Sequence, residues 1–348
     1  MNRIKSKSEF LLWPAMFAFL AVTPLYVPEG YARILIMAHY LAIFAMSWDI
    51  LSGHTGYISF GHTLLIATAG YTSAILSYPP GVWPVSTLHL GLPLYVTIPV
   101  GIALATIIGS VFFIPGLKTR GAYFVLVTLA AGVVGERIAM LSGNIGGASR
   151  GLFGYPTLAL GFVPNFYISL ILMCVIGFTL WHISRSDMGR LLRAIYMDEI
   201  ALSSLGKNVL KLKAVAFFLS ALVAGIGGSF YFHYLGSISP HSAFSFFLLI
   251  EIILAVIIGG KGTIIGPIIG AYFLTFILEG LRPLFPGALG PGRILAYLII
   301  GLAIYLVMPK GLYPTIKQLL KSLLRKSSIS MSVMTAKWWS WQEKSGSS

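Results

Sequence analysis

The chain has 348 residues, of which 57% are hydrophobic and only 10% are charged, and its formal net charge is +14. About a quarter of the residues in a soluble domain are charged, so this composition excludes an ordinary soluble protein. We therefore expect an all-α, polytopic helical membrane protein. Cys174, the one cysteine, lies in an apolar run, which excludes a disulfide framework and a cysteine-based metal site.

Apolar stretches long enough to cross a bilayer core, about 17 to 25 residues, recur along the chain. We predict about ten transmembrane spans, with glycine-rich broken segments between some of them. The expected spans are 11–27, 34–51, 60–77, 94–114, 122–141, 166–183, 214–235, 246–258, 264–281 and 294–308. The chain is thereby divided into an N-terminal segment 1–10, a transmembrane domain 11–308 and a basic tail 309–348.

Lysine and arginine are unevenly distributed among the segments that connect these spans. If the N-terminus is inside, 19 of the 24 basic residues fall on inside segments, as the positive-inside tendency requires. We therefore expect both termini, the loop 184–213 and the tail 309–348 to be cytoplasmic. This distribution also accounts for the positive charge without a nucleic-acid partner.

The loop 184–213 is the longest charge-rich stretch between the first and the last apolar span. Its apolar residues recur at helical spacing with charged residues between them, which predicts a short amphipathic helix that ends at Gly206. These residues are Leu191, Leu192, Ile195, Ile200 and Leu205. One interpretation is a helix that lies on lipid headgroups. The other is a docking helix for a soluble partner, which Asp198 and Glu199 favour because an anionic lipid surface would repel them.

Two glycine-rich stretches, 53–62 and 259–267, are too polar for a regular lipid-facing helix. Non-helical backbone at membrane depth is tolerated where it is buried in protein or lines a wet cavity. We predict that the first stretch forms part of the wall of a translocation pathway. The candidate residues are Gly53, Gly56, Ser59, Gly61, His62 and Glu251. The alternative is that the glycines only allow close packing of helices.

Carboxylates within apolar spans are costly when they face lipid, so they should face the bundle interior, a partner subunit or water. In an ion-driven transporter, Asp49, Glu251 or Glu279 would be the coupling carboxylate. The histidines lack metal-ligand spacing, no paired acid and base indicates an enzyme, and Gly206-Lys207-Asn208 does not complete a phosphate loop. We expect no metal, no cofactor and no nucleotide hydrolysis in this chain itself.

Several motifs, in order and at plausible spacing between Ser47 and Arg282, resemble those of the branched-chain amino acid ABC importer permeases. In the loop, Gly189-Arg190-Leu191-Leu192-Arg193-Ala194-Ile195 is followed by Asp198-Glu199-Ile200-Ala201 and Leu205-Gly206. The other motifs are Leu51–His62 with Ala69–Ala74, Leu117–Phe124 with Thr128–Ala130, Gly146–Leu152, Ile250–Glu251 and Gly259–Pro267.

The resemblance implies a permease subunit of the M-like type in the bacterial inner membrane. Its partners would be a second homologous permease, two ATPase subunits that hold ATP and Mg²⁺, and a periplasmic substrate-binding protein. The resemblance also implies that the loop seats in a groove of the ATPase and couples it to transport. That role falls on Gly189, Arg190, Arg193, Ala194, Asp198, Glu199, Ala201, Leu205 and Gly206. Import of urea or short amides, which closely similar permeases perform, stays open as the alternative.

Overall fold

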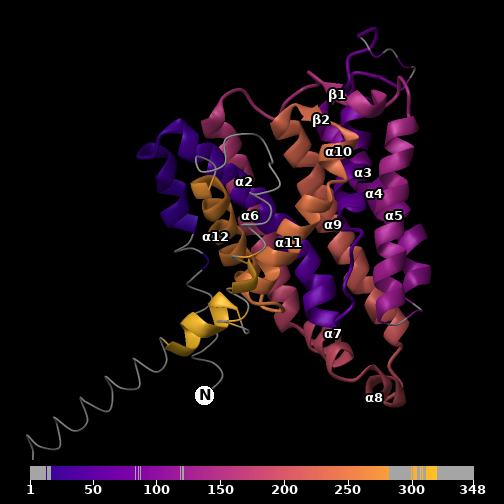
Figure 1. Ribbon diagram of the computed structural model, residues 1–348, viewed down its shortest axis with the longest axis vertical. Helices are drawn as coiled ribbons and strands as arrows, with labels where there is room; N and C mark the ends of the chain where they lie inside the picture. Colours follow the sequence, from indigo (N-terminus) through magenta and orange to yellow (C-terminus); the bar gives the residue numbers. More distant parts are fainter. Residues whose placement is uncertain are drawn as a thin grey trace, which may run out of the picture.

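The computed structural model describes residues 17–281 except Trp83, Val85, Thr87, Lys118 and Arg120, and it also describes Trp13, residues 299, 301–303, 306 and 308, and the segment 311–319. This part of the chain is predominantly helical, and its strands are two short ones, which confirms the predicted all-α class (Figure 1). The N-terminal segment 1–10 lies outside the described residues, as do five residues of the first predicted span and most of the tenth span and of the tail.

Eight helices match the second to the ninth predicted span, with bounds that differ by a few residues. They are α2 (Glu29–Trp48), α3 (His62–Ser77), α4 (Leu94–Gly116), α5 (Ala122–Leu141), α6 (Phe162–Arg185), α9 (Val209–Leu235), α11 (Phe246–Gly259) and α12 (Ile265–Leu281). Among the described residues, six helical segments are long and apolar enough to cross a membrane. The multi-pass architecture is confirmed, while the total of ten spans stays a prediction.

Helix α2 is the central helix of the bundle and contacts α6, α9, α11 and α12. Its apolar segment is 89% buried inside the protein, whereas that of α5 is 17% buried. The buried polar side chains of α2, His39 and Ser47, therefore contact other parts of the protein and not lipid, as the cost of placing them in hydrocarbon requires. His39, for example, shares a hydrogen bond of 2.8 Å with Ser169 of α6.

Short elements occupy the two opposite ends of the bundle (Figure 1). At one end, β1 (Leu152–Phe153) pairs antiparallel with β2 (Ser237–Ile238), beside α10 (Pro240–Ala243). At the other end lie α7 (Asp187–Met197) and α8 (Glu199–Ser204). The remaining short elements are the 3₁₀ turns η1 (Thr23–Leu25) and η3 (Ala148–Arg150) and the π-helical turn η2 (Asp49–Gly53).

The loop between α6 and α9 differs from the predicted single amphipathic helix. Asp198 has an extended backbone, and its carboxylate accepts hydrogen bonds from the amides of Ile200 and Ala201 at 2.9 and 3.0 Å. This N-cap starts the new helix α8, so α7 does not continue. The loop therefore holds two helices and not the single helix predicted, and Leu192 is buried whereas Ile200 and Leu205 are 61% and 76% exposed. The predicted stop at Gly206 is confirmed, with φ at +76°.

Candidate functional site

Three segments that are far apart in the sequence meet at the end of the bundle that carries α7 and α8. They are the broken stretch 49–61 after α2, the loop 184–208 that contains α7 and α8, and the turn 260–264 before α12. We call this meeting point the junction.

The broken stretch passes through the π-helical turn η2, is α-helical again at His54 and Thr55, and then runs without regular structure from Gly56 to Gly61. Trp48 Nε1 donates to the carbonyl of Ser59 at 2.8 Å, and the Ser52 hydroxyl donates to the carbonyl of Tyr57 at 2.9 Å. Glycine is required at position 56 for two reasons. Its φ is +79°, which residues with a side chain rarely adopt, and a Cβ there would lie 2.7 Å from the Tyr196 ring of α7. The predicted irregular backbone is confirmed in this stretch.

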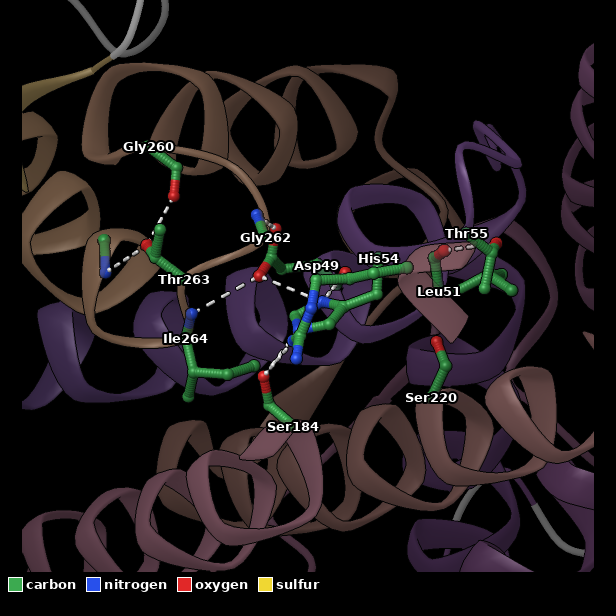
Figure 2. Close-up of polar contacts among 12 residues, drawn as sticks. Asp49, Leu51, His54, Thr55, Ser184, Ser220, Gly260, Gly262, Thr263 and Ile264 are labelled. Carbon is green, nitrogen blue, oxygen red and sulfur yellow. Dashed lines mark hydrogen bonds and ion pairs between the residues drawn. The ribbon is translucent and has the colours of Figure 1, made fainter. Parts of the chain in front are cut away.

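Asp49 ties the two glycine-rich stretches to each other (Figure 2). Its Oδ1 accepts a hydrogen bond from the amide of Gly262 at 2.6 Å, and its Oδ2 accepts one from the amide of Ile264 at 3.5 Å. The Asp49 side chain is fully buried. A Cβ at Gly53 would lie 1.9 Å from Asp49 Oδ1 and 2.9 Å from the Gly262 nitrogen, so only glycine fits between the two segments. Backbone amides of the turn thus form a small anion-accepting concavity that an aspartate of this chain fills.

His54 extends this contact toward α6 and α7. Its Nδ1 lies 3.1 Å from the Asp49 carbonyl oxygen, which can only accept, so the ring fits with the proton on Nδ1. Its Nε2 lies 2.8 Å from the Ser184 hydroxyl at the end of α6, as Figure 2 shows. The Arg193 guanidinium of α7 donates to the same hydroxyl at 3.1 Å. Burial, together with the nearby charge of Arg190, lowers the pKa of Arg193 from its ordinary value.

A second set of contacts joins α8 to the broken stretch. Lys213 Nζ lies 2.7 Å from Glu199 Oε1, and the Tyr57 hydroxyl donates to Glu199 Oε2 at 2.8 Å. Lys213 also donates to the Tyr57 hydroxyl oxygen and lies 4.0 Å from the centre of the Tyr57 ring. We call these three residues the Tyr57–Glu199–Lys213 cluster. The Lys213 side chain is 4% exposed and that of Glu199 is 22% exposed.

The residues predicted to couple the chain to an ATPase divide between the surface of the loop and its inner side. The exposed ones are Arg190, Asp198, Ala201, Leu205 and Gly206. Arg193, Ala194 and Glu199 are partly buried, and Gly189 is buried against the backbone of Ser184. Apolar side chains that the prediction did not include add to the exposed surface, because Met197 is 85% and Tyr196 50% exposed.

The predicted pathway residues lie in two different places. Ser59 and His62 are fully buried, and His62 Nε2 lies 2.9 Å from the Ser47 hydroxyl. Glu251 instead lines a cavity of about 190 Å³ between α2, α9, α11 and α12. This cavity shares Glu279 with a larger cavity of about 1330 Å³ that also contains Glu29 and Arg33. Neither cavity is lined by Gly53, Gly56, Ser59, Gly61 or His62. Their role in the pathway stays a prediction.

Sequence reasoning did not find Tyr57 and Ser184 as members of the junction, or Lys213 of α9 as a residue that contacts it. Lys213 carried the clearest signal, because it directly precedes a long apolar span, where a charge needs a partner. The partner, Glu199, lies 14 residues earlier in the sequence, across the end of α8 and a turn. Helical spacing cannot relate two residues that a glycine stop separates.

The fold and the junction define a class of protein, namely a multi-pass helical membrane protein whose two-helix loop is fastened to a broken segment of its central helix. A family model described as the permease component of branched-chain amino acid transport systems matches residues 30–308. The chain belongs to this family. The resemblance that its motifs showed is thereby confirmed.

Curated relatives agree with this assignment. The high-affinity branched-chain amino acid transport system permease protein LivM of Escherichia coli is 24% identical over 339 residues, which cover 88% of this chain and 75% of LivM. The ribose import permease protein RbsC of Haemophilus influenzae is 26% identical over 65% of this chain and 73% of its own length. A probable branched-chain amino acid permease, LivH of Methanocaldococcus jannaschii, is 28% identical over 67% of this chain and 78% of its own length.

The family consists of membrane permease components of ABC importers. The chain is accordingly a multi-pass permease of the bacterial inner membrane that works with ATPase subunits. The curated relatives LivM and RbsC are transport permeases.

Proposed function

We propose that this chain is the permease subunit of an ATP-driven importer of branched-chain, hydrophobic amino acids. The observation that carries the substrate is the similarity to LivM, which spans 88% of the chain, whereas the ribose permease RbsC matches 65%. A second homologous permease and a periplasmic binding protein complete the transporter in this proposal. ATP and Mg²⁺ are held by the ATPase partners, and both termini of this chain are cytoplasmic.

The ATPases dock on the loop that contains α7 and α8. Exposed apolar side chains beside charges, which suit a protein groove, support this docking site. They are Tyr196, Met197, Ile200 and Leu205, with Arg190, Asp198 and Lys207 around them. These residues lie outside the six segments that are long and apolar enough to cross a membrane.

In this mechanism, closure of the ATPases moves the loop, and the bundle alternates between outward-open and inward-open states. The binding protein selects the substrate, and the permease provides a route that binds it only weakly. The glycine-rich stretch 53–62 forms part of the wall of this route, a role that its irregular backbone supports.

A transport assay with the complete set of subunits tests the substrate. The purified transporter is reconstituted into liposomes with its binding protein, and labelled leucine, urea and ribose are offered separately. We expect leucine uptake that requires ATP on the ATPase side and that exceeds the uptake of urea and of ribose. Uptake of urea or ribose in preference to leucine would assign the other substrate. Leucine uptake by this chain alone, driven by an ion gradient, would make it a secondary transporter.

Docking is tested by Ile200→Asp. A charge at the centre of an apolar contact should weaken ATPase binding by about tenfold or more, since residues in such positions contribute about 2 kcal/mol. Ile200 is 61% exposed in α8, so the change should leave the fold of this chain intact. The measurement is the amount of ATPase that co-purifies with the permease in detergent.

Leu160→Asp is the matched control, because Leu160 is a 91% exposed apolar residue in the loop before α6, at the other end of that helix from α7. It should co-purify with as much ATPase as the wild type does. Equal ATPase recovery with Ile200→Asp and Leu160→Asp would show that the motor docks elsewhere.

A further inference from the structure

We propose that the Tyr57–Glu199–Lys213 cluster is the joint through which movement of α8 reaches the membrane bundle. The inference rests on the proposed function, in which the ATPases dock on the loop containing α7 and α8. It assigns Glu199 a role different from docking. The Glu199 carboxylate faces inward. Glu199 transmits to the bundle the movement that the ATPases impose on the exposed residues of the loop.

The two oxygens of Glu199 hold two different elements. Oε1 binds the Lys213 ammonium of α9 at 2.7 Å, and Oε2 accepts from the Tyr57 hydroxyl of the broken stretch at 2.8 Å. Among the described residues, Glu199 is the one side chain of α8 that hydrogen-bonds outside the loop. A displacement of α8 therefore acts on α9 and on the broken stretch at the same time.

Burial makes this connection stiff. Lys213 is 4% exposed, and its ammonium also donates to the carbonyl of Leu117 at the end of α4, at 3.4 Å. Separating a buried ammonium from its carboxylate leaves uncompensated charge, which is strongly unfavourable. When α8 is displaced, movement of α9 and Tyr57 together with it therefore requires less free energy than separation of the ion pair. An exposed ion pair such as Arg190 with Asp187, whose side chains are 67% and 86% exposed, would separate at little cost.

From Tyr57 the movement can pass further into the bundle. The Tyr57 ring packs edge-on against Phe124 of α5, with ring centres 5.5 Å apart. Three residues later, the amide of Phe60 donates to the Thr128 hydroxyl of α5 at 3.0 Å. The broken stretch is thus held to α5 on one side and to α8 and α9 on the other, so it lies between the proposed docking site and the bundle.

The test separates coupling from docking with Lys213→Met and Tyr57→Phe in the reconstituted transporter. Lys213→Met removes the ammonium, and Tyr57→Phe removes only the hydroxyl and keeps the ring on Phe124. We expect both variants to retain their ATPases and to hydrolyse ATP, while the ratio of ATP hydrolysed to leucine transported rises about tenfold. Lys211→Met is the matched control, because Lys211 is exposed two residues away on the same helix. Its ratio should equal that of the wild type.

Charge reversal provides a second arm in case Lys213→Met does not fold. Glu199→Lys alone should lose coupling, and Glu199→Lys combined with Lys213→Glu should regain part of it, because the ion pair is restored with opposite polarity. The proposal would be overturned if the ratio of ATP hydrolysed to leucine transported were unchanged in both Lys213→Met and Tyr57→Phe. A loss of transport in strict proportion to the loss of bound ATPase would also overturn it.

These outcomes differ from failure of the proposed function. If the ATPases dock elsewhere, Ile200→Asp will keep them, whatever Lys213→Met does. Ile200→Asp could release the ATPases while Lys213→Met keeps the wild-type ratio of ATP hydrolysed to leucine transported. That result would support the docking site and contradict the role of the Tyr57–Glu199–Lys213 cluster.

Discussion

Asp49→Ala is expected to lower the free energy of unfolding by about 3 kcal/mol, because it leaves buried backbone amides without acceptors. These amides are those of Gly262 and Ile264, which the Asp49 carboxylate now binds. His54, 3.7 Å from the carboxylate, would lose its neighbour as well. Thermal unfolding of the purified chain in detergent measures the effect as a fall in Tm.

Asp187→Ala is the matched control for this change. Its side chain is 86% exposed and pairs with Arg190 on the surface of α7, so its loss should change stability by less than about 1 kcal/mol. Equal Tm values for Asp49→Ala and the wild type would contradict a stabilising role of the hydrogen bonds from the amides of Gly262 and Ile264 to Asp49. If Asp49→Ala kept its Tm but abolished uptake driven by an ion gradient, Asp49 would be the coupling carboxylate of a secondary transporter.

Gly53→Ala should destabilise the protein by about 2 kcal/mol, because the new methyl group overlaps neighbours that cannot move independently. It would meet Asp49 Oδ1 at 1.9 Å and the Gly262 nitrogen at 2.9 Å, which forces the broken stretch and the turn apart. The same substitution in α2, Gly30→Ala, has no atom within 4 Å of the new Cβ. It should stabilise the helix by about 0.5 kcal/mol.

Both variants carry the same substitution, glycine to alanine, at positions 23 residues apart. The difference between their Tm values therefore isolates the contact at the junction. We expect Gly53→Ala to unfold at a lower and Gly30→Ala at an equal or higher temperature than the wild type. The close approach would be contradicted if the two variants shifted Tm equally.

The helices were predictable because length and apolarity decide them. The spans predicted from Leu94 and from Ala122 begin at the residues where α4 and α5 begin. Gly206 was recognisable as a helix stop because glycine is the residue that most readily adopts the left-handed conformation there. These features depend on residues that are neighbours in the sequence.

The junction was only partly predictable because its contacts join distant residues. Tyr57 and Glu199 are 142 positions apart, and Asp49 and Gly262 are 213 apart. The sequence indicated that both glycine-rich stretches are irregular, but it carried no signal that Asp49, which precedes the first, binds amides of the second. Likewise, the motif placed Glu199 in the loop without showing that its carboxylate faces inward.

The burial of α2 has a consequence for how the protein is made. α2 precedes α9, α11 and α12 in the chain, although these helices surround it, and the last of them ends at Leu281. The Asp49 carboxylate can therefore accept hydrogen bonds from the amides of Gly262 and Ile264 only after these two residues have been synthesised. The interior around α2 is therefore complete only after α12 has been synthesised.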